Sequence, residues 1–507
     1  MDILTNTLSI LFRYRQKQIE KFGDNLEDLQ KQQLKKLIAS NRSTEWGKSH
    51  HYNDIHSYND FANQVPVNIY DDLKPYIEQM LHGGRNILCP SGVKWYAKSS
   101  GTTNDKSKFI PVNEPILHQC HYQGGFDSVA LYLRNYEDSH LFSRKNLILG
   151  GSHSPHSINP YAHCGDLSAV LLQHLNPLVN LVRVPSKQII LMSEWEEKIK
   201  QIVAHTRTKD VVSLSGVPSW MLVLIKAVMK SCGAQYLTEV WPNLEVFFHG
   251  GISFEPYRER YKQLIPSDRM HYMETYNASE GFFGLQDDPS DHSLLLMPDY
   301  GIYYEFIPMS EVGKENPTTI PAHEVKTGVN YAMVISTVGG LWRYQIGDTV
   351  RFTSLFPHKF VISGRTKHFI NAFGEELMVD NADKAISATC HITGAKIAEY
   401  TAAPLFLLDK GKGRHQWVIE FDQEPASMEF FTKTLDEQLQ SVNSDYEAKR
   451  YKEISLQMPE VIAAPHGTFY NWLENRGKLG GQHKIPRLSN DRKIIEELLN
   501  GRTKLDS

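Results

Sequence analysis

One segment of the chain, Tyr96 to Pro111, carries side chains suited to binding a polyphosphate. A β-prone lead-in ends in Ser99-Ser100-Gly101-Thr102-Thr103, and Lys106 and Lys108 follow. Glycine lets the backbone approach an anion closely, while hydroxyls, amide N–H groups and a lysine ammonium supply hydrogen bonds and charge. The Walker spacing G-x-x-x-x-G-K-[ST] is absent, so this is a different kind of phosphate loop. A surface turn rich in Ser and Thr is the alternative interpretation.

Further motifs follow the loop along the chain. They are Tyr276-Asn-Ala-Ser-Glu280, Trp342-Arg-Tyr-Gln-Ile-Gly-Asp348, Gly364-Arg365 with Phe373-Gly374-Glu375-Glu376, and Gly477-Lys478-Leu-Gly-Gly-Gln-His-Lys484-Ile-Pro486. In this order and at these separations the set resembles the adenylate-forming superfamily of acyl-CoA ligases, luciferases and peptide-synthetase adenylation domains.

The loop resembles one branch of that superfamily more specifically, the auxin-responsive Gretchen Hagen family of acyl acid amido synthetases. Its lysine stands seven residues after Gly101, and Val65-Pro66, Tyr70–Ile77 and Gln482–Arg487 also fit. The resemblance extends from about Trp46 to Arg487. It implies an enzyme that uses ATP and Mg²⁺ to convert a carboxylic acid into an acyl-adenylate and pyrophosphate. The acyl group then passes to an amine, expected to be an amino acid, and AMP is released.

The resemblance assigns the phosphate contacts to the loop. Lys108 is expected to be catalytic, binding the β- and γ-phosphates together with four hydroxyl residues, Ser99, Ser100, Thr102 and Thr103. Asn104 stands where the superfamily usually has glycine. Asn tolerates a positive φ better than most residues, so the turn is expected to survive.

The resemblance assigns the binding of Mg²⁺ and of the adenine to motifs that follow the loop. By resemblance, Glu280 is a Mg²⁺ ligand, and one protein carboxylate is sufficient for a cation that also binds phosphates. Tyr276 is expected to lie against the adenine, with Gly250 and Gly251 beneath it. The alternatives are a helix-capping Ser279-Glu280 pair and an ordinary strand-to-turn Gly-Gly.

The ribose is assigned to two further residues. Asp348 is expected to accept hydrogen bonds from the ribose diol, and Arg365 to contact the ribose or a phosphate at the hinge. An exposed turn residue after Gly347 is the alternative for Asp348.

A mobile catalytic lysine is expected near the C-terminus. Lys484 is the first candidate for neutralising charge between the carboxylate and the α-phosphate, and Lys478 is the rival. Domain movement is a known way to run two reactions in one site. A basic C-terminal surface is the alternative.

Length and periodicity indicate how these residues are positioned. At 507 residues the chain exceeds what one core usually supports. We expect an α/β fold, with a large ATP- and acyl-binding domain of layered sheets and helices over 1–364. A smaller, mobile C-terminal α+β lid domain is expected over 365–507. The apolar runs predict amphipathic helices within 5–40, strands at Leu147–Leu149, Val211–Leu214 and Leu244–Phe248, and a helix over Ser219–Ser231 with Ser219 as N-cap.

Composition narrows the class of protein. A formal charge of −4 gives no general attraction to nucleic acid or acidic lipid, so neither is expected as a partner. Five widely spaced cysteines without a C-x-x-C pair favour a reducing compartment, and a cytoplasmic protein is expected. The oligomeric state stays open.

The motifs also bear on other possible functions. No Gly-x-Ser-x-Gly elbow is present, which argues against a serine hydrolase. An acyl-CoA ligase, which shares the adenylation step, is the main alternative function. A catalytically inactive nucleotide-binding protein is a further one. The sequence names neither the acid nor the amine.

Overall fold

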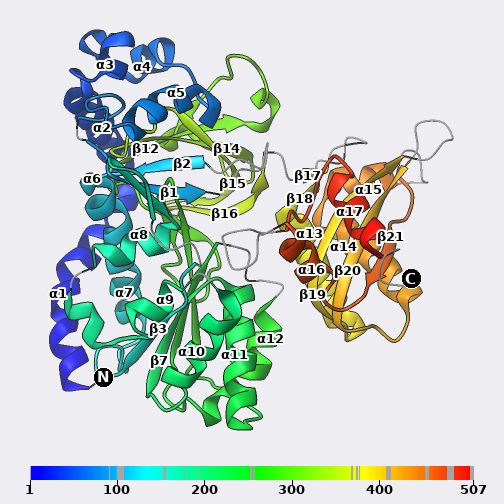
Figure 1. Ribbon diagram of the computed structural model, residues 1–507. Coiled ribbons are helices and arrows are strands. Elements are labelled where there is room, and N and C mark those ends of the chain that lie inside the picture. Colours follow the sequence, from blue (N-terminus) through cyan, green and yellow to red (C-terminus); the bar gives the residue numbers. More distant parts are fainter. Residues whose placement is uncertain are drawn as a thin grey trace. The chain divides into compact units, whose positions relative to one another are not determined.

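The computed structural model describes residues 2–90, 92–99, 108–151, 156–175, 177–192, 194–251, 254, 257–366, 369–370, 372, 375, 377–406, 413–450, 456–476 and 485–502. The chain divides into two compact units (Figure 1). The first consists mainly of Met1–Ile346 and Arg351–Val361, and the second mainly of Gly347–Val350 and Ile362–Leu479 with the C-terminal segment.

Among the described residues the largest sheet has twelve strands. In spatial order they are β13 (Ile320–Pro321), β12 (Ile302–Pro308), β14 (Asn330–Thr337), β15 (Tyr344–Leu355), β16 (His358–Arg365), β11 (Leu294–Leu296), β10 (Gly281–Leu285), β9 (His271–Ala278), β8 (Val246–Gly250), β7 (Val211–Gly216), β3 (Lys145–Ile148) and β6 (Arg183–Val184). Strands β9, β8, β7, β3 and β6 pair in parallel, whereas β9–β10, β10–β11, β11–β16 and β12–β14 are antiparallel.

Helices cover both faces of the parallel strands. Phe247 and Phe248 are neighbours in β8 and therefore point to opposite faces. Phe247 stacks on Tyr261 of α12 (Arg258–Leu264) with ring centroids 5.2 Å apart. Phe248 meets Tyr132 of α7 (Gln123–Asn135) edge-on at 5.7 Å. This part of the sheet is thus the middle layer of an α/β arrangement.

The large unit contains further helices, most of them amphipathic. They are α1 (Ile3–Ile19), α2 (Phe22–Asn41), α3 (Glu45–Ser49), α4 (Tyr58–Gln64), α5 (Tyr70–Leu81), α6 (Glu114–Ile116), α8 (Leu167–Gln173), α9 (Lys187–Ile190), α10 (Trp195–Thr206) and α11 (Pro218–Cys232). A π-helical turn, Leu117–Tyr122, joins α6 to α7. Along the part of the chain that the structure describes, no helix is both long and apolar enough to cross a bilayer.

A smaller four-stranded sheet carries the ends of the predicted phosphate loop. Its order is β2 (Lys108–Val112), β1 (Trp95–Ser99), β5 (Ala162–Gly165) and β4 (His156–Asn159). Strand β2 is antiparallel to β1 and stands at the end of this order.

The second unit is α+β. Its sheet has the order β19 (Lys396–Phe406), β20 (Gly413–Gln423) and β21 (Glu460–Ala464), beside a short pair, β17 (Phe369–Ile370) and β18 (Leu377–Met378). Its helices are α13 (Val379–Thr393), α14 (Met428–Val442), α15 (Ser444–Arg450), α16 (Thr468–Asn475) and α17 (Lys493–Arg502). Tyr400 and Trp417 stack in its core at 5.6 Å, among buried side chains of α13 and α14.

Most of the strands and helices expected from the sequence are present, but the predicted N-cap of one helix is wrong. Strands β3, β7 and β8 and the helices of 5–40 confirm the periodicity. Helix α11, however, starts at Pro218, and its N-cap is Val217 without a side-chain hydrogen bond, so Ser219 is not the cap. Proline suits the first helical position because that N–H has no helical partner in any case. Gly233, with φ +64°, ends the helix.

Candidate active site

The predicted phosphate loop closes the hairpin formed by β1 and β2. Ser99 is the last residue of β1, and it pairs with Lys108, the first residue of β2. Ser100, Thr102 and Thr103 lie outside the described residues. The structure therefore describes the two strand ends from which the loop departs, and the contacts assigned to the loop hydroxyls stay predictions.

Lys108 lies against two tyrosines from distant parts of the chain. Its Nζ donates to the hydroxyl oxygen of Tyr344 at 3.3 Å. The same nitrogen is 5.7 Å from the ring centroid of Tyr70 and 5.9 Å from that of Tyr344. The Tyr70 hydroxyl in turn accepts the backbone N–H of Phe109 at 2.8 Å. The sequence motifs around residues 70, 108 and 344 thus meet at one place.

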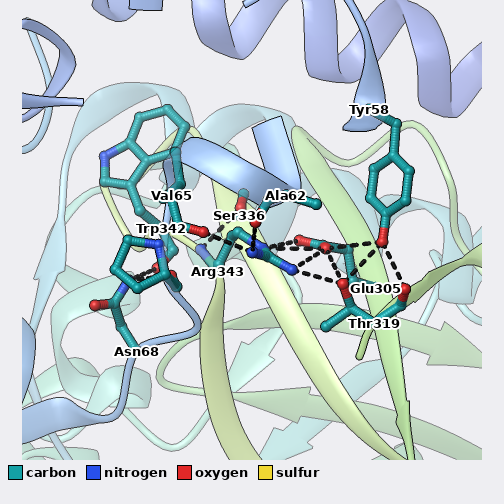
Figure 2. Close-up of polar contacts among 10 residues, drawn as sticks. Tyr58, Ala62, Val65, Asn68, Glu305, Thr319, Ser336, Trp342 and Arg343 are labelled. Carbon is teal, nitrogen blue, oxygen red and sulfur yellow. Dashed lines mark hydrogen bonds and ion pairs between the residues drawn. The ribbon is translucent and has the colours of Figure 1, made fainter. Parts of the chain in front are cut away.

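The chain just before Tyr70 pairs with the Trp342–Asp348 motif at a single residue. Asn68 forms an isolated parallel bridge with Tyr344. Its N–H donates to the Arg343 carbonyl, and its own carbonyl accepts the N–H of Gln345, both at 2.8 Å. The Asn68 side chain donates to the Trp342 carbonyl, also at 2.8 Å (Figure 2). This bridge therefore fixes the backbone of Tyr344 and that of the residue two positions before Tyr70.

Beside this bridge lies a buried ion pair between Arg343 and Glu305 of β12 (Figure 2). Arg343 Nε is 3.0 Å from Glu305 Oε2, and Nη2 is 2.9 Å from Oε1. Nη1 donates to the carbonyls of Ala62 and Val65 at 2.8 and 2.6 Å. Nη2 also donates to the Thr319 hydroxyl at 2.5 Å. Every guanidinium nitrogen of Arg343 thus has an acceptor.

Arg343 adopts this position with a left-handed backbone, at φ +40°. Such a conformation costs a residue with a Cβ about 1–2 kcal/mol, and it persists only where the surroundings hold it. Its N–H donates to the Ser336 hydroxyl at 2.9 Å, and the two ladder bonds to Asn68 fix the flanking peptides. The side-chain network and these backbone bonds offset the strain.

Glu280 and Tyr276 belong to a β-hairpin. Strand β9 ends at Ala278 and β10 begins at Gly281, so Ser279 and Glu280 form the turn, and the helix-cap alternative is wrong. Glu280 is 8% exposed. The ring of Tyr276 is buried, with Phe283 at 4.9 Å and Phe360 at 6.0 Å. Their roles as Mg²⁺ ligand and adenine contact stay predictions.

Gly250 ends β8, and Gly251 follows it. A Cβ on Gly250 would lie 2.3 Å from the carbonyl oxygen of Thr275 in the neighbouring strand, so only glycine fits there. Gly251 has φ +86°, which also favours glycine. Close strand packing therefore explains Gly250 within the sheet itself, and the approach of an adenine ring to these glycines is untested.

The preceding residue, His249, is buried and stacks on Phe254 at 4.1 Å. Burial, together with the charges of Arg258 and His292, lowers the pKa of His249 to about 3. The imidazole is therefore neutral near pH 7, and it extends the aromatic packing beneath the end of β8.

Asp348 and Arg365 form an ion pair within the second unit. Arg365 Nε lies 2.9 Å from Asp348 Oδ1, and their side chains are 37% and 19% exposed respectively. Asp348 lies inside β15 and not in a turn, so the exposed-turn alternative is wrong. The two residues that the sequence assigned to the ribose are thus brought together, and their ligand stays a prediction.

Lys484 and its rival Lys478 lie outside the described residues. The chain that follows them is anchored to β19. The Pro486 carbonyl accepts the Thr401 hydroxyl at 2.7 Å, and the Arg487 carbonyl accepts the N–H of Ala402 at 2.8 Å. The Arg487 guanidinium lies 4.6 Å from the Tyr400 ring and 3.2 Å from Asp383. The end of the lysine motif is therefore fixed to the second unit.

Sequence reasoning gave no role to Arg343, Glu305, Tyr70 or Tyr344. A signal for the ion pair was present, since Glu305 is the one charge in the run Ile302–Pro308 and Arg343 follows Gly339-Gly340-Leu341-Trp342. A lone charge in an apolar strand needs a buried partner. Among the described residues no group of three or more His, Cys, Asp or Glu side chains is arranged to hold a metal.

Comparison with known proteins identifies relatives along most of the chain. The GH3 family N-terminal domain matches residues 15–270, the GH3 family central domain residues 295–365 and the GH3 family C-terminal domain residues 380–493. Indole-3-acetic acid-amido synthetase GH3.3 of Arabidopsis thaliana is 25% identical, over 95% of this chain and 92% of that protein. The 4-substituted benzoates-glutamate ligase GH3.12 of the same species is 22% identical, over 95% and 96%.

Solved structures show the same fold. GH3.15 acyl acid amido synthetase superposes with a TM-score of 0.76 at 18% identity, over 96% of this chain and 95% of that one. A 2-hydroxyisobutyryl-CoA ligase in the postadenylation state gives a TM-score of 0.57 at 13% identity, over 94% and 91%. The expected α/β fold, with a large N-terminal domain and a smaller α+β domain, is confirmed.

Proposed function

Since the chain belongs to the GH3 family, we propose that it is an ATP-dependent acyl acid amido synthetase. A carboxylate oxygen attacks the α-phosphorus of ATP, the bond to the β-phosphate breaks, and pyrophosphate leaves. An amine then attacks the acyl carbon of the adenylate. The bond from that carbon to the phosphate oxygen breaks, AMP leaves, and the amine gives up a proton as the amide forms.

The observation that carries this function is the meeting of two motifs 236 residues apart. Lys108, at the end of the loop suited to phosphates, contacts Tyr344, which lies in the motif that ends at Asp348. This contact supports the proposal, because the first half-reaction requires a cation close to the residues expected to bind the nucleoside.

The chemistry of that step is mainly electrostatic. The acid and the triphosphate are both anionic, and pyrophosphate leaves with still more negative charge, so the site must supply cations and donors. Lys108 neutralises charge on the β- and γ-phosphates. Glu280 would hold the Mg²⁺ that accompanies ATP, since such a cation needs only one or two protein carboxylates. Asp348 accepts hydrogen bonds from the ribose. No protein nucleophile is required, because the substrate carboxylate is the nucleophile.

The relatives suggest where to look for substrates. Two of them are named for indole-3-acetic acid and for 4-substituted benzoates with glutamate. We therefore place aryl and indolyl carboxylic acids first among the acyl donors and amino acids first among the acceptors. Lys484, or its rival Lys478, is the candidate for charge neutralisation at the α-phosphate. We further propose that the second unit acts as a lid and that the protein is cytoplasmic.

The test is acid-dependent exchange of labelled pyrophosphate into ATP in the presence of Mg²⁺. A panel of aryl, indolyl and aliphatic acids is compared with a reaction without acid. Exchange with any acid establishes adenylation, and the Glu280→Gln variant is expected to lose most of it. Undiminished exchange by this variant would remove Glu280 from the metal site.

The second half-reaction is tested by adding acceptors to the active acid. Amino acids are expected to yield an amide together with AMP. A thioester formed with CoA, and no amide, would instead make the protein an acyl-CoA ligase. Absence of exchange across the whole panel, with ATP still bound, would contradict the enzyme and favour an inactive nucleotide-binding protein.

A further inference from the structure

We infer that Tyr70 and Tyr344 are positioning residues that clamp the ammonium group of Lys108 at the place where the nucleotide polyphosphate binds. This inference rests on the proposed function, because that function supplies the polyphosphate. The clamp consists of one hydroxyl and two aromatic rings, and its members come from α5, β2 and β15.

Lysine needs such a clamp more than arginine does. Its ammonium is a compact charge on a flexible four-carbon stem, and it loses rotamer freedom whenever it is fixed. A lysine at the mouth of a loop would sample many positions before meeting a phosphate. Holding it in place before the nucleotide arrives removes that cost from the binding step.

The clamp restrains the ammonium through neutral groups. The Tyr344 hydroxyl accepts one of its hydrogen bonds at 3.3 Å. Both ring centroids lie within about 6 Å, the range over which an aromatic face attracts a cation. None of these three contacts cancels the positive charge, as a carboxylate would. All three contacts orient the lysine through uncharged groups.

Tyr70 also fixes the backbone that carries the lysine. Strand β2 stands at the end of its sheet, so its outward N–H groups have no neighbouring strand among the described residues. The Tyr70 hydroxyl accepts the N–H of Phe109, the residue next to Lys108, at 2.8 Å. Burial raises the pKa of Tyr70 above its usual value, so the hydroxyl stays neutral under ordinary conditions.

Both tyrosines are tied to the buried Arg343–Glu305 pair. Tyr344 follows Arg343 directly, and Tyr70 follows Asn68, which bridges to Tyr344. The strained backbone of Arg343 is held by these same contacts. A rigid support of this kind sets the position of a ligand-binding group before the ligand arrives.

The first experiment compares Tyr344→Phe, Tyr70→Phe and a matched control, Tyr331→Phe. Like Tyr70, Tyr331 accepts a backbone N–H, that of Lys326 at 3.0 Å, but it lies away from Lys108 in sequence and contacts. Loss of one hydrogen bond is expected to raise the KM for ATP by roughly 2- to 10-fold in both clamp variants, with kcat retained. The control is expected to leave KM unchanged.

The split between KM and kcat separates positioning from folding. A variant that merely folds less well has fewer active molecules, so its apparent kcat falls while its KM for ATP does not change. Unchanged KM values in both clamp variants would overturn the inference, and so would an equal rise in Tyr331→Phe.

A double-mutant cycle with Lys108→Met tests whether the tyrosines act through the lysine. Tyr344→Phe is expected to have no further effect on the KM for ATP once the ammonium is absent. The same fold-change in both backgrounds would mean that Tyr344 acts independently of Lys108, and the inference would fail.

A binding measurement keeps the clamp testable if the proposed function fails. Calorimetry with α,β-methylene-ATP needs no acid substrate and no turnover. Tyr344→Phe is expected to raise the Kd by the same factor as it raises the KM. An active wild type with an unchanged Kd in the variant rejects the clamp alone. If the wild type is inactive but binds the analogue more tightly than the variant does, only the proposed function is contradicted. If the wild type does not bind the analogue, the clamp is contradicted.

Discussion

Two ion pairs each include one residue of the same short segment, Trp342–Asp348, and they differ in how far they are buried. Arg343 and Glu305 are buried, with side chains 4% and 0% exposed, and further hydrogen bonds surround them. Asp348 and Arg365 remain open to solvent, at 19% and 37%. A buried pair holds one geometry because either charge alone would be costly there. A partly exposed pair contributes less to stability, because solvent and salt screen its charges.

We infer from this difference that one end of the segment stabilises the fold, while the other end is available for nucleotide binding. The arginine side of the segment fixes where Tyr344 lies, whereas the aspartate side carries the residue that we expect to bind the ribose in the proposed reaction. Substitutions in the two pairs should therefore move different quantities, stability for the first and nucleotide affinity for the second.

The largest effect is expected from Glu305→Ala. It leaves the Arg343 charge buried without its carboxylate, which typically costs about 3–5 kcal/mol of unfolding free energy. Urea denaturation of the purified variant measures the loss. Glu324→Ala is the control, because the Glu324 side chain is 58% exposed, and it should change stability by less than about 0.5 kcal/mol. A loss below about 1 kcal/mol in Glu305→Ala would contradict the view that the buried pair stabilises the fold more than the partly exposed one.

Asp348→Asn should mainly affect nucleotide binding. Hydrogen bonds to a charged group contribute about 1.5–3 kcal/mol, so the KM for ATP is expected to rise roughly 10- to 100-fold. Stability should fall by no more than about 1 kcal/mol, since exposed pairs contribute little. Steady-state kinetics at varied ATP, with denaturation of the same sample, checks both quantities. An unchanged KM would remove Asp348 from the ribose site.

Tyr58→Phe probes the edge of the buried network. The Tyr58 hydroxyl lies 3.2 Å from Glu305 Oε1, but Arg343 and Thr319 also donate to that carboxylate. The variant should therefore lose only about 1 kcal/mol, the usual contribution of one hydrogen bond. A loss as large as that of Glu305→Ala, measured by the same denaturation, would show that the hydroxyl and not the guanidinium stabilises Glu305.

The smallest effect is expected from Arg365→Met. Removing this exposed guanidinium should change stability by less than about 1 kcal/mol, and the change should shrink further as salt screens the pair. Denaturation at about 0.05 and 1 M NaCl gives the comparison. A large loss that salt does not reduce would place this pair in the same class as Arg343–Glu305.

Local features were predictable from the sequence, and long-range partners were not. The apolar runs Val211–Leu214 and Leu244–Phe248 predicted strands correctly, because a continuous apolar run of that length suits a buried parallel strand. The helix between these two strands starts at Pro218, one residue before Ser219, because proline suits the first helical position. Gly347 alone suggests a turn at Asp348, but Asp348 lies inside β15.

The same limit applies to the site. The type and spacing of residues pointed to Lys108 as a phosphate-binding cation. Nothing local to residue 108 indicates that its neighbours are Tyr70 and Tyr344, because those contacts depend on how β2, α5 and β15 assemble. Glu305 and Arg343 were each visible as a lone charge in an apolar setting, but their pairing across 38 residues was not.

The hydrogen bond from the Phe109 amide to the Tyr70 hydroxyl has a consequence for observing the protein at work. An outward-facing amide at the end of a sheet would ordinarily exchange its hydrogen with solvent rapidly, but this one is covered by a phenol. The rate of deuterium uptake at this amide therefore reports how often the start of β2 opens locally. Because the donor is the backbone N–H of Phe109, this amide can be followed in the unsubstituted protein without an added probe.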